Sequence, residues 1–170
     1  MDILYAPWRG KYVTKTARKK PIAIESKDCI FCAQFEKNED EKYYIFKRYK
    51  YNVVMLNLHP YNAGHLMILP IDHIANMYDL EKNAANEMMA LTSHSSKILT
   101  DILKCQGINI GMNLGKTAGA GLPGHLHMHA LPRWDGDTNW LPLLAQTKQV
   151  SVDLNHIYKE LKPAFKKLVF

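Results

Sequence analysis

Residues 124–132 read Gly124-His125-Leu126-His127-Met128-His129-Ala130-Leu131-Pro132. Histidines alternate here with apolar residues, and successive side chains of a β-strand point to opposite faces of a sheet. The stretch therefore predicts a strand that carries His125, His127 and His129 on one face. The other face then contributes apolar side chains to a hydrophobic core: Leu126, Met128 and Ala130.

A glycine-rich segment precedes the histidines. Residues 113–124 read Asn113-Leu114-Gly115-Lys116-Thr117-Ala118-Gly119-Ala120-Gly121-Leu122-Pro123-Gly124. Glycines let the backbone approach a ligand closely, and successive N–H groups in such a loop form a concave site for anions. Imidazoles on one strand face beside this loop indicate phosphate chemistry.

The residues alone leave three interpretations of the alternating histidines open. One imidazole attacks phosphorus while a neighbouring one protonates the leaving oxygen, with backbone amides holding the developing charge. Alternatively, histidines on alternate strand positions converge on a metal such as zinc. In the third interpretation they are ordinary, partly buried histidines with hydrogen bonds. We expect His59 and His94, which lie outside this stretch, to be exposed to solvent.

The bulk composition fits a globular protein. The chain has 170 residues, of which 47% are hydrophobic and 22% charged. We expect a single domain over residues 1–170, with a basic N-terminal arm (1–28), a core (29–162) and a C-terminal tail (163–170). Neither a run of about 18 apolar residues nor a signal-peptide pattern occurs, so we expect a cytoplasmic protein without membrane contact.

The charge favours anionic partners. The formal net charge is +6, and residues 3–24 contain basic but no acidic side chains. This arm reads as a solvated segment, a nucleic-acid contact or an edge that steers phosphates towards a site. We do not expect nucleic acid to be the main partner.

The cysteines form no disulfide framework. The sequence contains three, and Cys29 and Cys32 are spaced as a C-x-x-C pair. Such a pair is typical of a redox site, half of a metal site or two small core residues. A zinc site needs two further ligands, for which His73 and His125 are candidates. Cys105 reads as a buried thiol.

Aromatic, β-branched and alternating apolar residues predict strands, which are expected at 43–46, 51–58, 65–69, 108–114 and 125–131. Apolar residues at helical spacing predict a helix over 80–104, with Asp79 as its N-cap and Gly107 at its end. A last helix is expected to begin at a Ser151 cap and to be interrupted or ended by Pro163. This order predicts an α+β domain built on an antiparallel sheet.

The stretch 125–131 resembles the signature of the histidine-triad family, in which three histidines alternate with apolar residues, and it matches at every position. Residues 29–32 look like the zinc knuckle of the family, 56–70 like its nucleoside-binding strand pair and 113–119 like its phosphate loop. Within the family, residues 6–9 and 131–139 resemble bacterial diadenosine tetraphosphate phosphorylases and related hydrolases.

The resemblance implies a fold with a five-stranded antiparallel sheet flanked by a long helix and a C-terminal helix. It also implies roles for the histidines. His127 attacks the α-phosphorus of a nucleotide, His129 contacts the scissile phosphate and assists the leaving group, and His65 supports the triad. The implied nucleotide-binding residues are Asn57, Leu58, Asn113, Gly119, Gly121, His127 and His129.

The resemblance further implies a structural zinc ion, and the positions that match its ligands are Cys29, Cys32, His73 and His125. It implies no organic cofactor and a homodimeric assembly. Two positions depart from the pattern of many relatives, since Gly121 and Leu122 replace polar residues that contact substrate. Phosphate contacts are then expected from backbone N–H groups, Lys116 or Thr117.

The expected activity is cleavage of dinucleoside polyphosphates through a nucleotidyl-histidine intermediate, as a phosphorylase or a hydrolase. His129 argues against hexose-phosphate exchange, because that branch of the family carries glutamine at this position. The alternatives are a phosphoramidase that releases AMP from amine conjugates, a nucleotide- or nucleic-acid-binding module with little catalysis, and a metal-dependent hydrolase.

Overall fold

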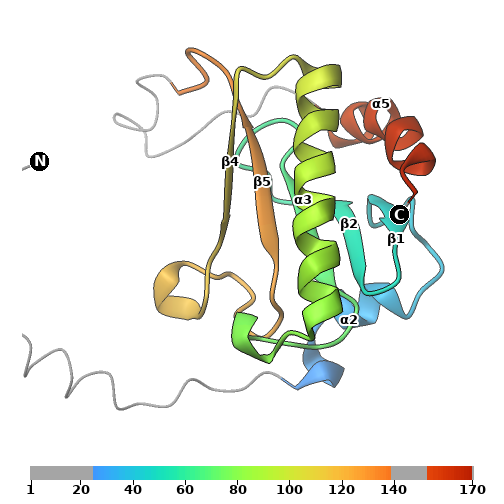
Figure 1. The fold of residues 1–170 in the computed structure, drawn as a ribbon, viewed down its shortest axis with the longest axis vertical. Helices are drawn as coiled ribbons and strands as arrows, with labels where there is room; N and C mark the ends of the chain where they lie inside the picture. The colour runs from blue at the N-terminus through green and yellow to red at the C-terminus, as the bar shows by residue number, and fades with distance from the viewer. Residues whose placement is uncertain (1–24, 139–152, 170) are drawn as a thin grey trace, which may run out of the picture.

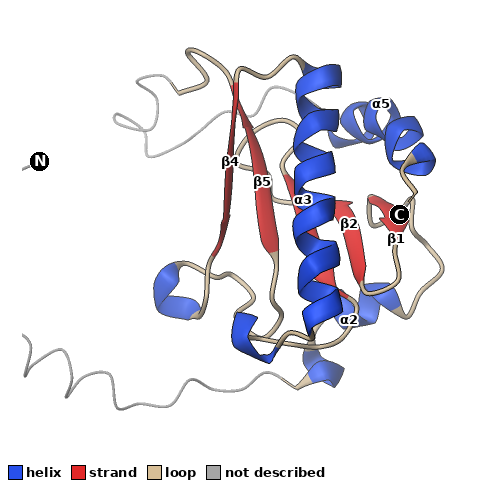
Figure 2. Cartoon of the chain, viewed as in Figure 1, coloured by secondary structure: helices blue, strands red, loops and turns tan. Residues whose placement is uncertain are grey.

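A computed structural model describes residues 25–138 and 153–169. Its sheet has five strands in the order β1-β2-β3-β5-β4, and every neighbouring pair is antiparallel. The strands are β1 (Ile45–Arg48), β2 (Asn52–Leu56), β3 (Leu66–Pro70), β4 (Gly107–Met112) and β5 (Met128–Arg133). The α-helices are α2 (Ile30–Phe35), α3 (Lys82–Leu103) and α5 (Leu154–Lys167) (Figures 1 and 2). The predicted α+β class and five-stranded antiparallel sheet are confirmed.

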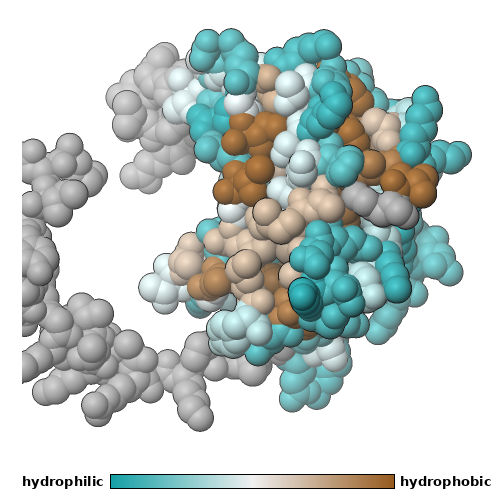
Figure 3. Space-filling view, in the orientation of Figure 1, coloured by the Kyte–Doolittle hydropathy of each residue, from teal (hydrophilic) through white to brown (hydrophobic). Residues whose placement is uncertain are grey.

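The two faces of the sheet pack against different helices. Val54 and Leu56 of β2 join the main hydrophobic cluster with residues of α3 and α5, whereas Val53 and Met55 join a second cluster with Phe31 and other α2 residues. Because side chains alternate along a strand, one apolar run supplies both clusters. In Figure 1, α3 crosses one face of the sheet, and Figure 3 shows hydrophilic residues over much of that side of the molecule.

The alternation predicted for residues 125–130 is present, although the strand begins later than expected. β5 starts at Met128, so His125 and His127 precede it. Leu126, Met128 and Ala130 nevertheless belong to the main cluster. The extended backbone therefore sorts its side chains by face even where it makes no regular ladder hydrogen bonds.

The predicted boundaries of the long helix need correction. Glu81, not Asp79, is the N-cap of α3, and its carboxylate accepts hydrogen bonds from the backbone N–H groups of Asn83 and Ala84. The helix ends at Leu103, and Lys104 follows in the left-handed conformation. Gly107 begins β4 instead of ending the helix. Several polar residues near the start of a helix can be its N-cap, and the sequence does not distinguish between them. The backbone geometry shows which residue has this role.

The C-terminal helix contradicts the predicted tail. α5 runs through Pro163 to Lys167, and Asp153 caps it by accepting from the N–H of His156. The predicted cap, Ser151, lies outside the described residues. A proline inside a helix costs about 3 kcal/mol, but the next turn carries Phe165, which is fully buried. Burial of this ring offsets the cost and makes residues 163–167 part of the fold.

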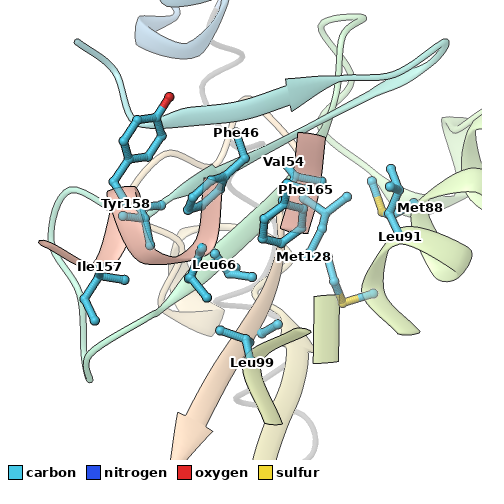
Figure 4. Packing of buried hydrophobic residues seen from close by; sticks show 14 of the residues in the cluster. Phe46, Val54, Leu66, Met88, Leu91, Leu99, Met128, Ile157, Tyr158 and Phe165 are labelled. Carbon is cyan, nitrogen blue, oxygen red and sulfur yellow. The ribbon is translucent and has the colours of Figure 1, made fainter. Parts of the chain in front are cut away.

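Phe165 joins a stack of aromatic rings under α5. Its ring lies 4.7 Å from that of Phe46, which lies 5.0 Å from that of Tyr158 (Figure 4). The stack ties the last helix to the edge strand β1. Across the described ranges, no helix is both long and apolar enough to span a bilayer.

Replacing Phe165 by alanine is expected to lower the free energy of unfolding by about 3–5 kcal/mol, because it removes a buried ring and leaves a cavity. Denaturant titration measures this loss. Val169→Ala is the control, since Val169 lies beyond the helix with 78% of its surface exposed, and it should change stability little. Equal stability of the two variants would contradict the integration of this segment into the core.

Candidate active site

A pocket of about 420 Å³ opens beside the histidines, on the sheet face that α2 covers. Its wall comes from α2, from β2 and β3, and from the segments that follow β2 and β4. All seven residues predicted to bind nucleotide line it: Asn57, Leu58, Asn113, Gly119, Gly121, His127 and His129. The volume lies in the range of small-molecule sites.

His127 is held in one orientation by the backbone. Its Nδ1 lies 2.8 Å from the carbonyl oxygen of His125, and the side chain is buried apart from the edge that reaches the pocket. A carbonyl oxygen only accepts hydrogen bonds, so Nδ1 carries the proton. In the neutral ring Nε2 is then unprotonated, which makes it a base and a nucleophile.

A hydrogen-bonded chain likewise orients His129. His65 is fully buried, and its Nδ1 accepts from the backbone N–H of Tyr61 at 3.2 Å and faces the amide nitrogen of Asn57 at 3.4 Å. Its proton therefore lies on Nε2, which donates to Nδ1 of His129 at 2.9 Å. Neutral His129 then carries its own proton on Nε2, at the far edge of its ring.

Burial keeps these two rings neutral near pH 7. Burial, with smaller contributions from the nearby imidazoles of His129 and His127, lowers the pKa of His65 to about 3. Burial, with a smaller contribution from His127, lowers the pKa of His129 to about 4. Charging either ring inside the protein costs free energy, because burial removes the hydration of the charged form.

The segment between β2 and β3 places Asn57, Tyr61 and His65 at the pocket. Gly64 has φ +74°, and a Cβ on it would collide with Leu103 of α3, so only glycine fits directly before His65. Asn62 anchors the segment by donating to the carboxylate of Asp137 at 2.7 Å and to the carbonyl of Pro132 at 3.0 Å.

Asp137 is the centre of this anchor. Arg133 donates to both of its carboxylate oxygens, at 2.6 and 2.9 Å, and holds the pKa of Asp137 well below its usual range. Through Asn62, the Arg133–Asp137 pair links the end of β5 to the segment that carries Tyr61 and His65. The sequence did not indicate this anchor, because Asn62 is distant from Asp137 along the chain.

The segment after β4 forms the opposite wall. Gly115 and Gly119 both have positive φ, +83° and +98°, a backbone conformation that favours glycine. They flank the short 3₁₀ helix η4 (Lys116–Ala118). The amide nitrogen of Asn113 lies near Gly119, at 3.8 Å from where a Cβ would stand. The predicted glycine-rich loop is thus beside the histidines.

The four predicted metal ligands come together. The ligand atoms of Cys29, Cys32, His73 and His125 all lie within 4.8 Å of one another. His125 Nδ1 lies 3.4 and 3.6 Å from the two sulfurs, and Cys32 Sγ lies 3.3 Å from His73 Nδ1. A tetrahedral zinc ion with the usual bond lengths separates sulfur and nitrogen ligands by about 3.5 Å. This Cys/His group has the composition and spacing of a metal site.

The protonation of these ligands also fits a cation. His125 Nε2 lies 2.9 Å from the carbonyl oxygen of Pro70 and therefore carries the proton, which leaves Nδ1 unprotonated towards the cysteines. Burial raises the pKa of the Cys32 thiol to about 11, and Cys29 adds to this shift. A bound cation overcomes that penalty by stabilising the thiolates.

Sequence reasoning missed much of the pocket wall. His59 is exposed as expected, but it lines the pocket. Met55 and Met67 could have been found from the alternation of β2 and β3. Leu122 was noted only as a departure from the pattern of many relatives. The remaining wall residues were not singled out from the sequence, and they are Asp28, Ile30, Phe31, Gln34 and Tyr61.

The fold and the pocket define a class: an antiparallel α+β domain with three alternating histidines, two of them in a nucleotide-sized pocket. The family model "HIT domain" matches residues 37–136, and the chain belongs to this family. It is 31% identical over 147 residues to a Mycobacterium tuberculosis protein named AP-4-A phosphorylase, covering 86% of this chain and 75% of that one.

Other relatives carry different names. The chain is 28% identical over 124 residues to the adenosine 5'-monophosphoramidase of Saccharomyces cerevisiae, covering 73% of each chain. Among solved structures, it resembles a zinc-bound histidine triad family protein of Mycobacterium smegmatis. That likeness has a TM-score of 0.68 at 23% identity, covers 84% of this chain and 96% of that one, and shows the shared fold.

The buried, neutral His65 is expected to make stability sensitive to acid. The ring binds a proton near pH 6.5 when unfolded but only near pH 3 when folded. The unfolded state therefore binds more protons between these values, so the free energy of unfolding falls as the pH falls through this window. Denaturant titrations between pH 7 and 4.5 should show a shallower loss for His65→Asn than for the wild type.

His156→Asn is the matched control for this measurement, because His156 lies on the exposed side of α5. It should keep the pH dependence of the wild type. An unchanged slope in His65→Asn would contradict the neutral state assigned to the buried ring.

Proposed function

We propose that this protein is a HIT-family enzyme that cleaves dinucleoside polyphosphates through a nucleotidyl-His127 intermediate. The observation that carries the proposal is the hydrogen bond from His127 Nδ1 to the His125 carbonyl. It leaves Nε2 unprotonated at the edge of a pocket that His129 also lines. A neutral, oriented imidazole is an effective nucleophile towards phosphorus.

In the first step, His127 Nε2 attacks the α-phosphorus, a P–N bond forms and the P–O bond to the leaving group breaks. From diadenosine tetraphosphate the leaving group is ATP, and AMP stays on the histidine. The imidazole ring of His127 becomes cationic when the P–N bond forms, and the His125 carbonyl stabilises this charge by accepting a hydrogen bond from Nδ1. This positive charge makes the P–N bond labile.

His129 serves the leaving oxygen. Its Nε2 proton is available because His65 donates to its Nδ1 and keeps the ring in that tautomer. The low pKa of His129, about 4, favours a neutral donor that hydrogen-bonds to the oxygen as charge develops. His65 touches no substrate in this scheme and acts by orienting His129.

In the second step, an oxygen of water or inorganic phosphate attacks the phosphorus and the P–N bond breaks. Water yields AMP, and phosphate yields ADP. Both routes share the first step, so the histidines do not choose between phosphorylase and hydrolase. The named activity of the Mycobacterium tuberculosis relative, AP-4-A phosphorylase, supports phosphate as the acceptor.

The remaining pocket residues divide between nucleoside and phosphate. Asn57 contacts the ribose and Leu58 packs on the base, next to the apolar wall of Phe31 and Met67. The residues that hold the phosphates come from the glycine-rich segment and are Asn113, Gly119 and Gly121. The positive φ of Gly119 keeps side chains away from this part of the backbone.

A second candidate is hydrolysis of AMP–amine conjugates, which the name of the Saccharomyces cerevisiae relative supports. The same histidines perform it, since the amine replaces the polyphosphate as leaving group. The P–N bond to the amine breaks as His127 attacks, the Nε2–H of His129 hydrogen-bonds to the departing group, and the amine takes its proton from solvent water. The candidates differ in the leaving group, and the product analysis below separates them.

The proposal includes a structural zinc ion bound by Cys29, Cys32, His73 and His125. A zinc ion bound there would hold the start of α2 against the segments that carry His73 and His125. Phe31, between the two cysteines, lines the pocket, and its ring lies 5.5 Å from that of His125 and 5.8 Å from that of His127. Zinc bound by these residues would therefore support the nucleoside wall.

We also propose that the protein forms a homodimer. β4 is an edge strand of the sheet, and Ile110 on it is 51% exposed. Among the described strands, β4 has a neighbour on one side alone. A second copy of the chain can pair with the backbone of such an edge strand and cover its exposed apolar side chain.

Substituting His127 by asparagine is expected to abolish turnover of diadenosine tetraphosphate without unfolding the protein, because the nucleophile is lost while the fold remains. Nucleotide products are resolved with and without inorganic phosphate. Wild type should yield ATP together with ADP when phosphate is present. AMP with ATP in both conditions would assign water as the acceptor.

His94→Asn is the control, because His94 lies on the exposed side of α3, away from the pocket. It should retain wild-type turnover. Retained activity in a folded His127→Asn variant would refute the mechanism. Turnover of an AMP–amine conjugate alone would favour the second candidate.

Replacing Cys32 by serine is expected to remove bound zinc and to lower the melting temperature, since metal binding contributes to folding. KM should rise more than kcat falls, because α2 supports the nucleoside wall. Elemental analysis, thermal denaturation and steady-state kinetics check these effects. Cys105→Ser, which changes a buried thiol outside the ligand group, should keep its zinc. Full zinc content in Cys32→Ser would reject the ligand assignment.

A further inference from the structure

The pocket is lined by polar and by apolar side chains. Its polar lining includes His127, His129 and Asn113, and its apolar lining includes Phe31, Met55 and Met67, which also belong to the second hydrophobic cluster. Polar side chains suit a phosphate, and apolar side chains suit a planar base. A polar atom without a partner among the apolar residues therefore needs an explanation of its own.

Gln34 is such a residue. It lines the pocket from α2, between Phe31 and Phe35 of the second cluster, and only 6% of its surface is exposed. Its amide oxygen Oε1 is buried and has no hydrogen-bond partner within residues 25–138 and 153–169. A buried acceptor left unpaired is costly, and an apolar residue of similar size would avoid that cost.

The adjacent metal group fixes where this amide stands. Gln34 follows Cys32 by two residues on the same short helix, and the Cys/His group ties the start of that helix to the sheet. Gln34 is thus a buried residue of the pocket wall on a helix whose start is held in place, and is not a surface side chain. An unpaired amide in such a place points to a ligand that completes its hydrogen bonds.

We propose that Gln34 recognises the edge of the nucleotide base and selects a base with a donor next to an acceptor, as adenine presents. This inference rests on the proposed nucleotide function and names the base. Oε1 accepts from the 6-amino group of adenine, and the amide nitrogen donates to the neighbouring ring nitrogen, the usual pairing of glutamine with adenine. A purine without the amino group leaves Oε1 unpaired and binds more weakly.

Gln34 is a specificity residue, because it touches the base and not the reacting phosphorus. Its loss should weaken binding of adenine nucleotides while the histidine chemistry stays intact. A purely structural role would weaken binding of every nucleotide alike, so the two roles make different predictions.

The test compares AMP with purine riboside 5'-monophosphate, which lacks only the 6-amino group, by isothermal titration calorimetry. Wild type should bind AMP about tenfold more tightly or better, the discrimination typical of one good bidentate pair. In Gln34→Met the two affinities should become equal, mainly through weaker binding of AMP. Gln106→Met, which removes an exposed amide bonded to Asp135, should keep the wild-type ratio.

Two results would overturn the inference. Equal affinity of the unmodified protein for both nucleotides would exclude base reading by Gln34, and this measurement needs no variant to fold. If Gln34→Met lowers the affinity for both nucleotides by the same factor, Gln34 has a structural role and does not read the base. Failure of the proposed function is distinct, because a wild type that binds neither nucleotide would reject that proposal and this inference with it.

Discussion

Alternation of side chains along residues 125–130 is the constraint on which both the core and the candidate site depend. Antiparallel pairing places His129 opposite Met67 on β3 and Gly111 on β4. Met128 and Ala130 then point into the core under α3 and α5. A shift of one residue in this register would bury the imidazoles in that core and bring apolar groups into the pocket. Packing energy thus enforces the orientation that the chemistry needs.

The same backbone also distributes protons among the histidines. The carbonyl of His125 fixes the proton of His127 on Nδ1, and the carbonyl of Pro70 fixes that of His125 on Nε2. The lone pair of His127 is then on Nε2, and that of His125 is on Nδ1, towards the cysteines. Neighbouring residues of one type are therefore suited to different chemistry because their backbone partners differ, and the proposed function assigns one to phosphorus and the other to a metal ion.

The histidine face and the glycine-rich segment could be predicted from the sequence, because alternation and glycine spacing are local. The resemblance to the histidine-triad family supplied the seven candidate nucleotide-binding residues, which all line one pocket, and the full set of four candidate ligands, which form one group. Helix ends were less predictable. Glu81 instead of Asp79 caps α3, because its carboxylate reaches the first free N–H groups of the helix. α5 continues past Pro163, because Phe165 packs on an aromatic ring that is distant along the chain.

The tautomers and the unpaired amide of Gln34 could not be predicted. Both depend on which atoms of distant segments meet, such as the contact of His65 with Tyr61 and with His129. A sequence without coordinates contains no signal for these contacts. The proposed roles of His127, His129 and Gln34 all depend on these contacts.

The most direct measurement of the central claim is detection of the covalent intermediate. Wild-type protein is mixed with diadenosine tetraphosphate and quenched within milliseconds in alkaline denaturant, because phosphoramidates are labile in acid, and the peptides are then analysed by mass spectrometry. The account predicts an adenylyl group on His127 that appears and decays at the rate of turnover. Turnover without an adduct, or an adduct on His129, would contradict it.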